Sequence, residues 1–176
     1  MALWTVGSAV TESGGGATLT KDATNGWFPN STAKTIANYA KAGNTLTHSA
    51  LRNASDYHVF GWGDATAAPA GNGYDDVQYG WFIDVGGGTA QWRETGVAGP
   101  TFAAAAADLL EVVIVNGIAK GYIAGILKVT SGIPVVATNC KGVVVIFGAN
   151  AFHTVVTLNA VPLFNPTNDG SWIALL

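Results

Sequence analysis

Residues 109–130 read LLEVVIVNGIAKGYIAGILKVT, in which apolar, largely β-branched runs are separated by two short turns. The pair Asn116-Gly117 is the preferred sequence of a type I′ turn, in which both residues take positive φ angles. The pair Ala124-Gly125 predicts a second tight turn, because glycine adopts such angles without steric cost. β-branched runs joined by turns of this kind are typical of antiparallel strands. We therefore expect consecutive strands at 109–115, 118–123 and 126–130.

Strand-like patterns continue on both sides of this stretch. Residues 77–85 alternate, so that Val77, Tyr79, Trp81, Ile83 and Val85 share one face, and the turn at 86–88 leads into a strand at 90–94. Further strands are expected at 4–10, 17–20, 34–37, 45–51, 57–62, 143–147 and 153–161. Segments 32–42 and 102–110 contain good helix formers. For the alanine run in 102–110, the preceding Gly99-Pro100 and the following Val-rich strand favour an extended loop or strand edge.

Composition narrows the class of protein. The chain has 176 residues, of which 49% are hydrophobic and only 11% charged, and its formal net charge is -3. Such a chain offers no basic patch for phosphate contacts, so nucleic-acid binding is not expected. The start carries no pattern of an export signal, and the apolar stretches are too short to span a bilayer. Cys140 is the single cysteine, is expected in a loop, and forms no intrachain disulfide. We expect a soluble protein made in a cytoplasm.

Five segments in the middle of the chain resemble a known group of domains. They are 74–83 (YDDVQYGWFI), 92–97 (WRETGV), 106–112 (AADLLEV), 115–122 (VNGIAKGY) and 125–131 (GILKVTS). In order and spacing they resemble the concanavalin A-like, SPRY-like jelly-roll modules of bacteriophage structural proteins and bacterial surface proteins. Weaker likeness extends to 26–28, 57–62 and 144–161. The chain departs from the usual pattern at Ala107, where the family has Gly, and at Ile123-Ala124-Gly125, where it has Lys-Asn-Gly.

The resemblance implies an all-β fold, a two-sheet antiparallel jelly-roll sandwich of the concanavalin A-like lectin type, formed by residues 1–176 as a single domain. Hydrolases of this fold place two carboxylates on one strand beside the scissile bond. Here Glu12, Glu94 and Glu111 are isolated, and the adjacent Asp75 and Asp76 would point to opposite faces of a strand. His48, His58 and His153 show no metal-ligand spacing. We expect no catalytic residues, no metal site and no cofactor.

The segment from Gly63 to Asp76 is the candidate ligand loop. Trp62, Asp64, Tyr74 and Asp76 are its candidate glycan-binding residues, because aromatic rings stack on sugars and loops at strand ends commonly carry function. For the aromatic residues we favour the alternative that they pack beneath a loop. Asp64, Asn72, Asp75 and Asp76 also offer the oxygen ligands that Ca²⁺ prefers. We favour the alternative that these four residues are ordinary turn formers and bind no Ca²⁺. Trp27 is a further loop aromatic, whereas Trp4, Trp81 and Trp92 are expected inside the sandwich.

Two functions follow from the resemblance. The first is a virion structural accessory protein of a bacteriophage, decorating the head or associated with the tail, neck or fibre, exposed on the particle and aiding adhesion to the host surface. Its partners would be capsid or tail subunits, with the protein present as a homo-oligomer or in many copies. The scarcity of charged residues fits a surface that packs against neighbours. The alternative is a lectin-like module that recognises host-surface glycans, and a shared fold does not decide between the two.

Overall fold

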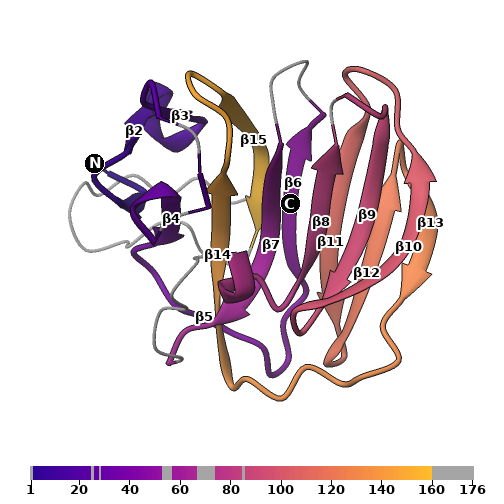
Figure 1. The fold of residues 1–176 in the computed structure, drawn as a ribbon. Coiled ribbons are helices and arrows are strands. Elements are labelled where there is room, and N and C mark those ends of the chain that lie inside the picture. The colour runs from indigo at the N-terminus through magenta and orange to yellow at the C-terminus, as the bar shows by residue number, and fades with distance from the viewer. Residues whose placement is uncertain are drawn as a thin grey trace.

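The computed structural model describes residues 2–24, 26–27, 29–52, 57–66, 74–84 and 86–159. Within these ranges two antiparallel sheets pack face to face (Figure 1). The eight-stranded sheet, which faces the viewer in Figure 1, has the order β1 (Trp4–Val6), β4 (Thr32–Thr35), β14 (Asn139–Ile146), β7 (His58–Asp64), β8 (Tyr79–Asp84), β9 (Thr89–Glu94), β10 (Val97–Ala103), with β5 (Tyr39–Ala40) paired to β14.

The seven-stranded sheet lies behind the first. Its order is β13 (Ile126–Thr130), β12 (Ile118–Ile123), β11 (Leu109–Val115), β6 (Leu46–Leu51), β15 (Phe152–Asn159), β3 (Thr18–Lys21), β2 (Val10–Ser13). Three short 3-10 turns complete the described elements: η1 (Gly14–Gly16), η2 (Pro29–Ser31) and η3 (Tyr74–Asp76). None of the helices in the described ranges is long and apolar enough to cross a membrane. The prediction of an all-β, two-sheet antiparallel sandwich is confirmed.

The hairpins predicted from turn sequences are confirmed in detail. Asn116 and Gly117 have φ angles of 52° and 74°, and Val115 pairs with Ile118 across the turn. Ala124 and Gly125 take the same left-handed angles, 50° and 74°, between β12 and β13. Local turn chemistry therefore sets the register of this part of the seven-stranded sheet.

The predicted single strand at 4–10 is wrong, because the chain changes sheets there. β1 pairs with β4 in one sheet, whereas β2 pairs with β3 in the other. The crossing point is Gly7, where a Cβ atom would lie 2.3 Å from the carbonyl oxygen of Asn30. A glycine is needed because two backbones touch at this position.

Two further expectations need correction. Val77 precedes β8 and packs with Val59 and Val143 on the outer face of the eight-stranded sheet, on the side opposite to Tyr79. Cys140 lies within β14 and is buried, rather than in a loop.

The segment 102–110 holds the end of a strand and a loop, as expected, and no helix. The strand is β10, which runs through Gly99-Pro100 because its pairing with β9 shifts register between Ala98 and Thr101 and so accommodates the proline.

Three tryptophans fill the space between the sheets. Trp62, Trp81 and Trp92 are each at most 1% exposed, and the rings of Trp81 and Trp92 meet edge to face at 5.2 Å. Gly121 of β12 lies against them: a Cβ there would stand 2.5 Å from Trp81 Cζ2 and 2.8 Å from Trp92 Cζ3. The indoles therefore fit only because the opposing strand has no side chain at this point.

Three histidines are buried together in the same interior. His48, His58 and His153 are 0% exposed, and the His153 ring centroid lies 5.0 Å from that of His58 and 6.1 Å from that of His48. His48 Nδ1 lies 2.9 Å from the Gly61 carbonyl oxygen and donates to it, while neither ring nitrogen of His153 has a hydrogen-bond partner among the described residues. Burial lowers the pKa of His48 to about 4 and holds that of His153 well below 6.5.

Ala107→Gly should stabilise the protein. Ala107 has a φ of 67°, in the left-handed region where a Cβ is strained, and this is the position at which the resemblance led us to expect Gly. We expect the free energy of unfolding in urea to rise by about 0.5–1 kcal/mol. The matched control is Ala106→Gly, one residue earlier, exposed and without a positive φ, which should lower it. A loss of stability in both variants would contradict the strain at Ala107.

Acid should destabilise the fold through His48 and His153. The unfolded chain takes up protons near pH 6.5, whereas the folded protein keeps both rings neutral, so their contribution is complete above about pH 7.5 and declines as the pH falls below 6.5. We expect the free energy of unfolding to be about 2–3 kcal/mol lower at pH 5.5 than at pH 7.5. His153→Leu should make this dependence shallower, and identical curves for wild type and variant would refute the assignment.

Candidate functional site

Trp62 is not available to a ligand. It lies inside β7, is 0% exposed, and its Nε1 donates a 3.0 Å hydrogen bond to the carbonyl oxygen of Val112 on the opposite sheet. The prediction that Trp62 stands at a strand end beside the ligand loop is therefore wrong: β7 continues two residues further, to Asp64, and carries the indole into the core.

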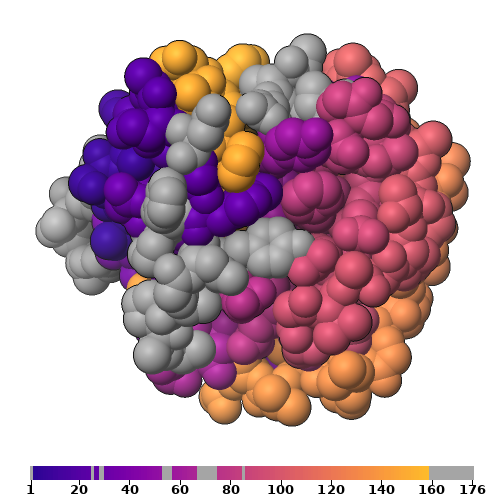
Figure 2. All heavy atoms as spheres, in the orientation of Figure 1, coloured from indigo at the N-terminus to yellow at the C-terminus, as the bar shows by residue number. Residues whose placement is uncertain are grey.

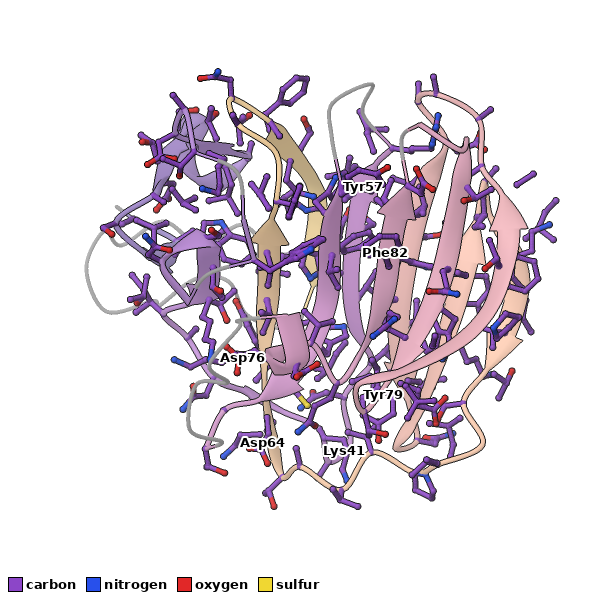
Figure 3. The ribbon with its side chains drawn as sticks, viewed as in Figure 1. Lys41, Tyr57, Asp64, Asp76, Tyr79 and Phe82 are labelled. Atoms are coloured by element: carbon purple, nitrogen blue, oxygen red, sulfur yellow. The ribbon has the colours of Figure 1, made fainter. Side chains whose placement is uncertain are left out.

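The aspartates of the candidate loop serve the chain itself. Asp64 Oδ1 accepts hydrogen bonds of 2.8 Å from both the backbone nitrogen and the hydroxyl of Thr66. The Asp76 side chain is 6% exposed, and its Oδ2 lies 2.9 Å from Lys34 Nζ. Figure 3 shows Asp64 and Asp76 near the lower left of the sheet. Both carboxylates thus have structural partners, as the turn-forming alternative predicts.

The remaining parts of that loop give no further support to a sugar or calcium site. Residues 67–73 lie outside the described residues, and of Tyr74 only the backbone in η3 is described. Within the described ranges, no group of three or more His, Cys, Asp or Glu side chains is arranged to hold a metal ion. The described residues therefore do not bring Trp62, Asp64 and Asp76 together around an open site.

An exposed face exists instead on the outer side of the eight-stranded sheet. We call it the β8–β10 face; it consists of Tyr57, Phe82, Gln91, Arg93 and Thr101. Cross-strand pairs place Phe82 opposite Gln91, and Gln91 opposite Thr101, in one row across β8, β9 and β10. The segments from β8 to β10 cover the right side of the molecule in Figure 2.

The aromatic residues Tyr57 and Phe82 form one end of this face. Tyr57, just before β7, is 36% exposed and stacks on half-buried Phe82, with ring centroids 6.0 Å apart and an interplanar angle of 21°. Trp27 also packs against Phe82, with ring centroids 6.0 Å apart. Figure 3 shows Tyr57 and Phe82 close together near the top of the sheet, with Tyr79 well below them. Trp27 therefore supports the platform, and Tyr57 presents it to solvent.

Planar polar groups continue the face toward the sheet edge. Gln91 Nε2 donates to Thr101 Oγ1 at 3.3 Å, and Arg93 Nη2 donates to the Gly96 carbonyl oxygen at 3.0 Å. Both side chains are half-buried, so their positions are restricted while part of each remains accessible. An aromatic platform beside fixed amide and guanidinium groups can hold the apolar face of a sugar ring and its hydroxyls at once.

The rim between the two sheets carries a shallow cleft of about 320 Å³. Its floor is Trp92, and its walls include Val97, Val129 and Ile133. Glu94 also lines it, but both carboxylate oxygens are engaged: Oε1 accepts from Ser131 Oγ at 2.5 Å and Ile133 N at 3.1 Å, and Oε2 accepts from Trp92 Nε1 at 3.1 Å. Glu94 therefore ties β9 to the segment after β13 and is not placed for acid catalysis.

The other candidate reactive groups are also engaged or separated. Glu12 accepts from the backbone nitrogens of Leu3 and Trp4, and Glu111 lies on the seven-stranded sheet. Burial raises the pKa of the Cys140 thiol to about 11, which disfavours the reactive thiolate. The described glutamates thus do not form the facing pair that glycoside hydrolysis uses.

Tyr57, Phe82, Gln91 and Arg93 were not among the site residues predicted from the sequence. One signal was present: the strand at 77–85 carries Phe82 on its otherwise polar face, and a large aromatic residue facing solvent is unusual. The partnership of Phe82 with Tyr57 and Gln91 depends on the register of three strands, which the sequence of one strand does not specify.

Neither a protein-family model nor a curated protein sequence matches the chain. Solved structures do. The TRIM65 PSpry domain aligns with a TM-score of 0.64 at 10% identity, over 87% of this chain and 86% of that one. The carbohydrate-binding module CBM66 from Bacillus subtilis aligns at 0.51 and 14%, over 90% and 94%. The Emp47p carbohydrate recognition domain aligns at 0.55 and 10%, over 87% and 85%.

These neighbours are named for different roles and share one architecture, so they establish the fold and not a ligand. SPRY domains, a carbohydrate-binding module and a lectin-type recognition domain all superpose on nearly the whole of this sandwich. This protein has the concanavalin A-like jelly-roll fold, as its resemblance to SPRY-like modules led us to expect.

Proposed function

We propose that this protein is a lectin-like carbohydrate-binding module whose ligand lies on the β8–β10 face. The observation that carries the proposal is the exposed Tyr57 ring, stacked on Phe82 and followed across the sheet by Gln91 and Thr101. Two structural neighbours are named as carbohydrate-binding or carbohydrate-recognition domains, which supports this choice among the roles the fold can serve.

The dimensions of the face suit a short saccharide. Neighbouring strands lie about 4.8 Å apart, so the row from Phe82 to Thr101 spans about 10 Å, close to the length of a disaccharide. The ring C–H groups would pack on Tyr57, and sugar hydroxyls would bond to Gln91 and Arg93. The shallow, open geometry favours a surface polysaccharide or glycan chain over a small molecule enclosed in a pocket.

The proposed role is binding without catalysis. Glu12 and Glu94 hold backbone and side-chain donors at distant points of the sandwich, and Glu111 faces away from the β8–β10 face on the other sheet. The histidines are enclosed between the sheets. A sugar on the β8–β10 face would therefore meet groups that orient it, and none of the three glutamates would stand beside its glycosidic bond.

Tyr57→Ala should weaken glycan binding about tenfold or more, because an exposed aromatic anchor commonly contributes that much. The measurement is an array of defined oligosaccharides and bacterial cell-surface polysaccharides, followed by titration of the best binder. Tyr57→Phe keeps the ring and should retain most of the affinity. The matched control is Phe152→Ala, which removes a 40% exposed aromatic ring from the other sheet and should change nothing.

Failure of the folded wild-type protein to bind any member of such an array would overturn the proposal. Equal losses in Tyr57→Ala and Phe152→Ala would overturn the placement of the site on the β8–β10 face. Urea midpoints of all variants should be compared first, so that unfolding is not mistaken for lost binding.

We further infer a setting for this module: a structural accessory subunit exposed on a bacteriophage particle, made in the cytoplasm of the bacterial host. The sequence resemblance motivates this inference, and the described surface supports it. Val97, Ile126 and Val136 are 66%, 60% and 79% exposed, and exposed apolar side chains of this size are expected where subunits pack.

The protein should be found in purified particles and should be accessible from outside. Mass spectrometry of density-gradient-purified particles tests its presence, and antibody labelling or protease digestion of intact particles tests its exposure. Its absence from particles, or its protection until they are opened, would refute the virion setting and leave the glycan-binding proposal to its own test.

A further inference from the structure

The outer side of the seven-stranded sheet carries an unusually apolar patch. We call it the hairpin face; it consists of the outward side chains of β11 and β12 together with Leu127 of β13, namely Leu109, Glu111, Val113, Val115, Ile118, Lys120, Tyr122 and Leu127. The alternate residues Leu110, Val112 and Ile114 are buried in the core, which fixes the first set as outward. A solvent-facing strand surface is normally polar, so this composition points to a partner.

Cross-strand pairing makes the apolar part of the face continuous. Val115 lies opposite Ile118, and Tyr122 lies opposite both Glu111 and Leu127. Leu127 is 48% exposed, and its partner Tyr122 is half-buried. Neighbouring side chains on one face of a sheet touch at these spacings.

The outward side chains of β11 and β12 include two charged residues, which have opposite signs. Lys120 pairs with Val113, two residues along β11 from Glu111, so Glu111 and Lys120 are diagonal neighbours. In the part of the chain that the structure describes, the ion pairs are Lys21 with Asp22 and Lys34 with Asp76, and neither Glu111 nor Lys120 belongs to one. One carboxylate and one ammonium group thus stand in an apolar field.

The arrangement of Glu111 and Lys120 is complementary to the same arrangement on a second copy of the chain. Consider two copies that meet face to face, related by a two-fold axis in the plane of the interface. If this axis crosses the line from Glu111 to Lys120 at a right angle, midway between them, Glu111 of each copy lies against Lys120 of the other. Both ion pairs form at once, and the apolar side chains around them meet like side chains. We propose that the hairpin face binds a second copy of this chain, sheet face against sheet face.

Pairing through the strand edges is disfavoured. This holds for the edge strand of each sheet on this side of the sandwich. Pro100 and the irregular register of β10 block addition of a strand to the eight-stranded sheet, and the register shift between Gly121 and Tyr122 places an extra residue in β13, the edge of the seven-stranded sheet. Natural sheets use prolines, lysines and bulges in this way to prevent edge-to-edge association. The contact between copies therefore uses the face of the sheet and not its backbone.

The contact is small, which sets its expected strength. Three strands about 4.8 Å apart and about 20 Å long give roughly 300 Å² of projected area, less than the roughly 800 Å² per partner of a standard interface. We expect a dimer with a dissociation constant of about 10–100 µM, which becomes significant where many copies are held close together.

The test is sedimentation velocity of the full chain from about 1 to 300 µM. Wild type should shift from monomer to dimer over this range. Glu111→Lys and Lys120→Glu should each weaken dimerisation about tenfold or more by placing like charges together, and the double swap Glu111→Lys with Lys120→Glu should restore it.

The control is Lys141→Glu, which makes the same charge change on the outer side of the other sheet and should leave the dimer intact. A wild type that stays monomeric at 300 µM would overturn the proposal. So would single reversals without effect, or a double swap that does not restore association. Urea unfolding of each variant distinguishes lost association from lost folding, and glycan binding is not part of the readout.

Discussion

The inter-sheet tryptophan layer is the constraint on which the rest of this sandwich depends. Trp62 and Trp81 stand on the eight-stranded sheet, and their indole nitrogens donate to the carbonyl oxygens of Val112 and Glu111 on β11. A buried indole N–H needs an acceptor, and a strand carbonyl has a second lone pair to offer. Each ring thus fills the core and also fixes the position of one sheet over the other. Two further features favour the same alignment of the sheets. Gly121 has no side chain that would clash with the indoles, and Glu94 on β9 bonds to the segment after β13.

Much of the fold was predictable from local sequence, because the information is local. Asn116-Gly117 specifies a turn by its own φ preferences, and the alternation at 77–85 places Trp81 inward whatever its partner is. The division of 4–10 into two strands was not predictable, since it depends on contact between Gly7 and Asn30. Trp62 was misplaced because Gly61 and Gly63 interrupt the apolar alternation of β7 and make its end look like a loop.

The candidate site was less predictable than the fold. Aspartates near turns suggested a ligand loop, but Asp64 and Asp76 are held by Thr66 and Lys34, and a sequence does not reveal which acidic groups are already engaged. The β8–β10 face arises only when β7, β8, β9 and β10 are aligned, since Tyr57, Phe82 and Gln91 come from separate segments. Strand register therefore determines the surface chemistry here.

The low charge of the chain has a structural meaning once the charged groups are placed. Several of the few carboxylates stabilise backbone segments: Glu12 at the first strand, Asp84 at the turn after β8, and Asp108 before β11. The surface is therefore solvated mainly by hydroxyl and amide groups. Against that background, an unpaired acid and base within one apolar patch carry more information than they would on an ordinary charged surface.

The two proposed surfaces lie on opposite sides of the sandwich, and this geometry constrains how they work together. If two copies meet through their seven-stranded sheets, the β8–β10 face of each points outward, away from the contact. Such a dimer presents its two sugar-binding faces in opposite directions, so it links separate glycan chains and does not grip one flat surface twice. On a particle, the same arrangement would let one copy attach to an underlying layer of like subunits while its β8–β10 face stays exposed. The core that joins the sheets thus also keeps the proposed assembly surface and the proposed recognition surface apart.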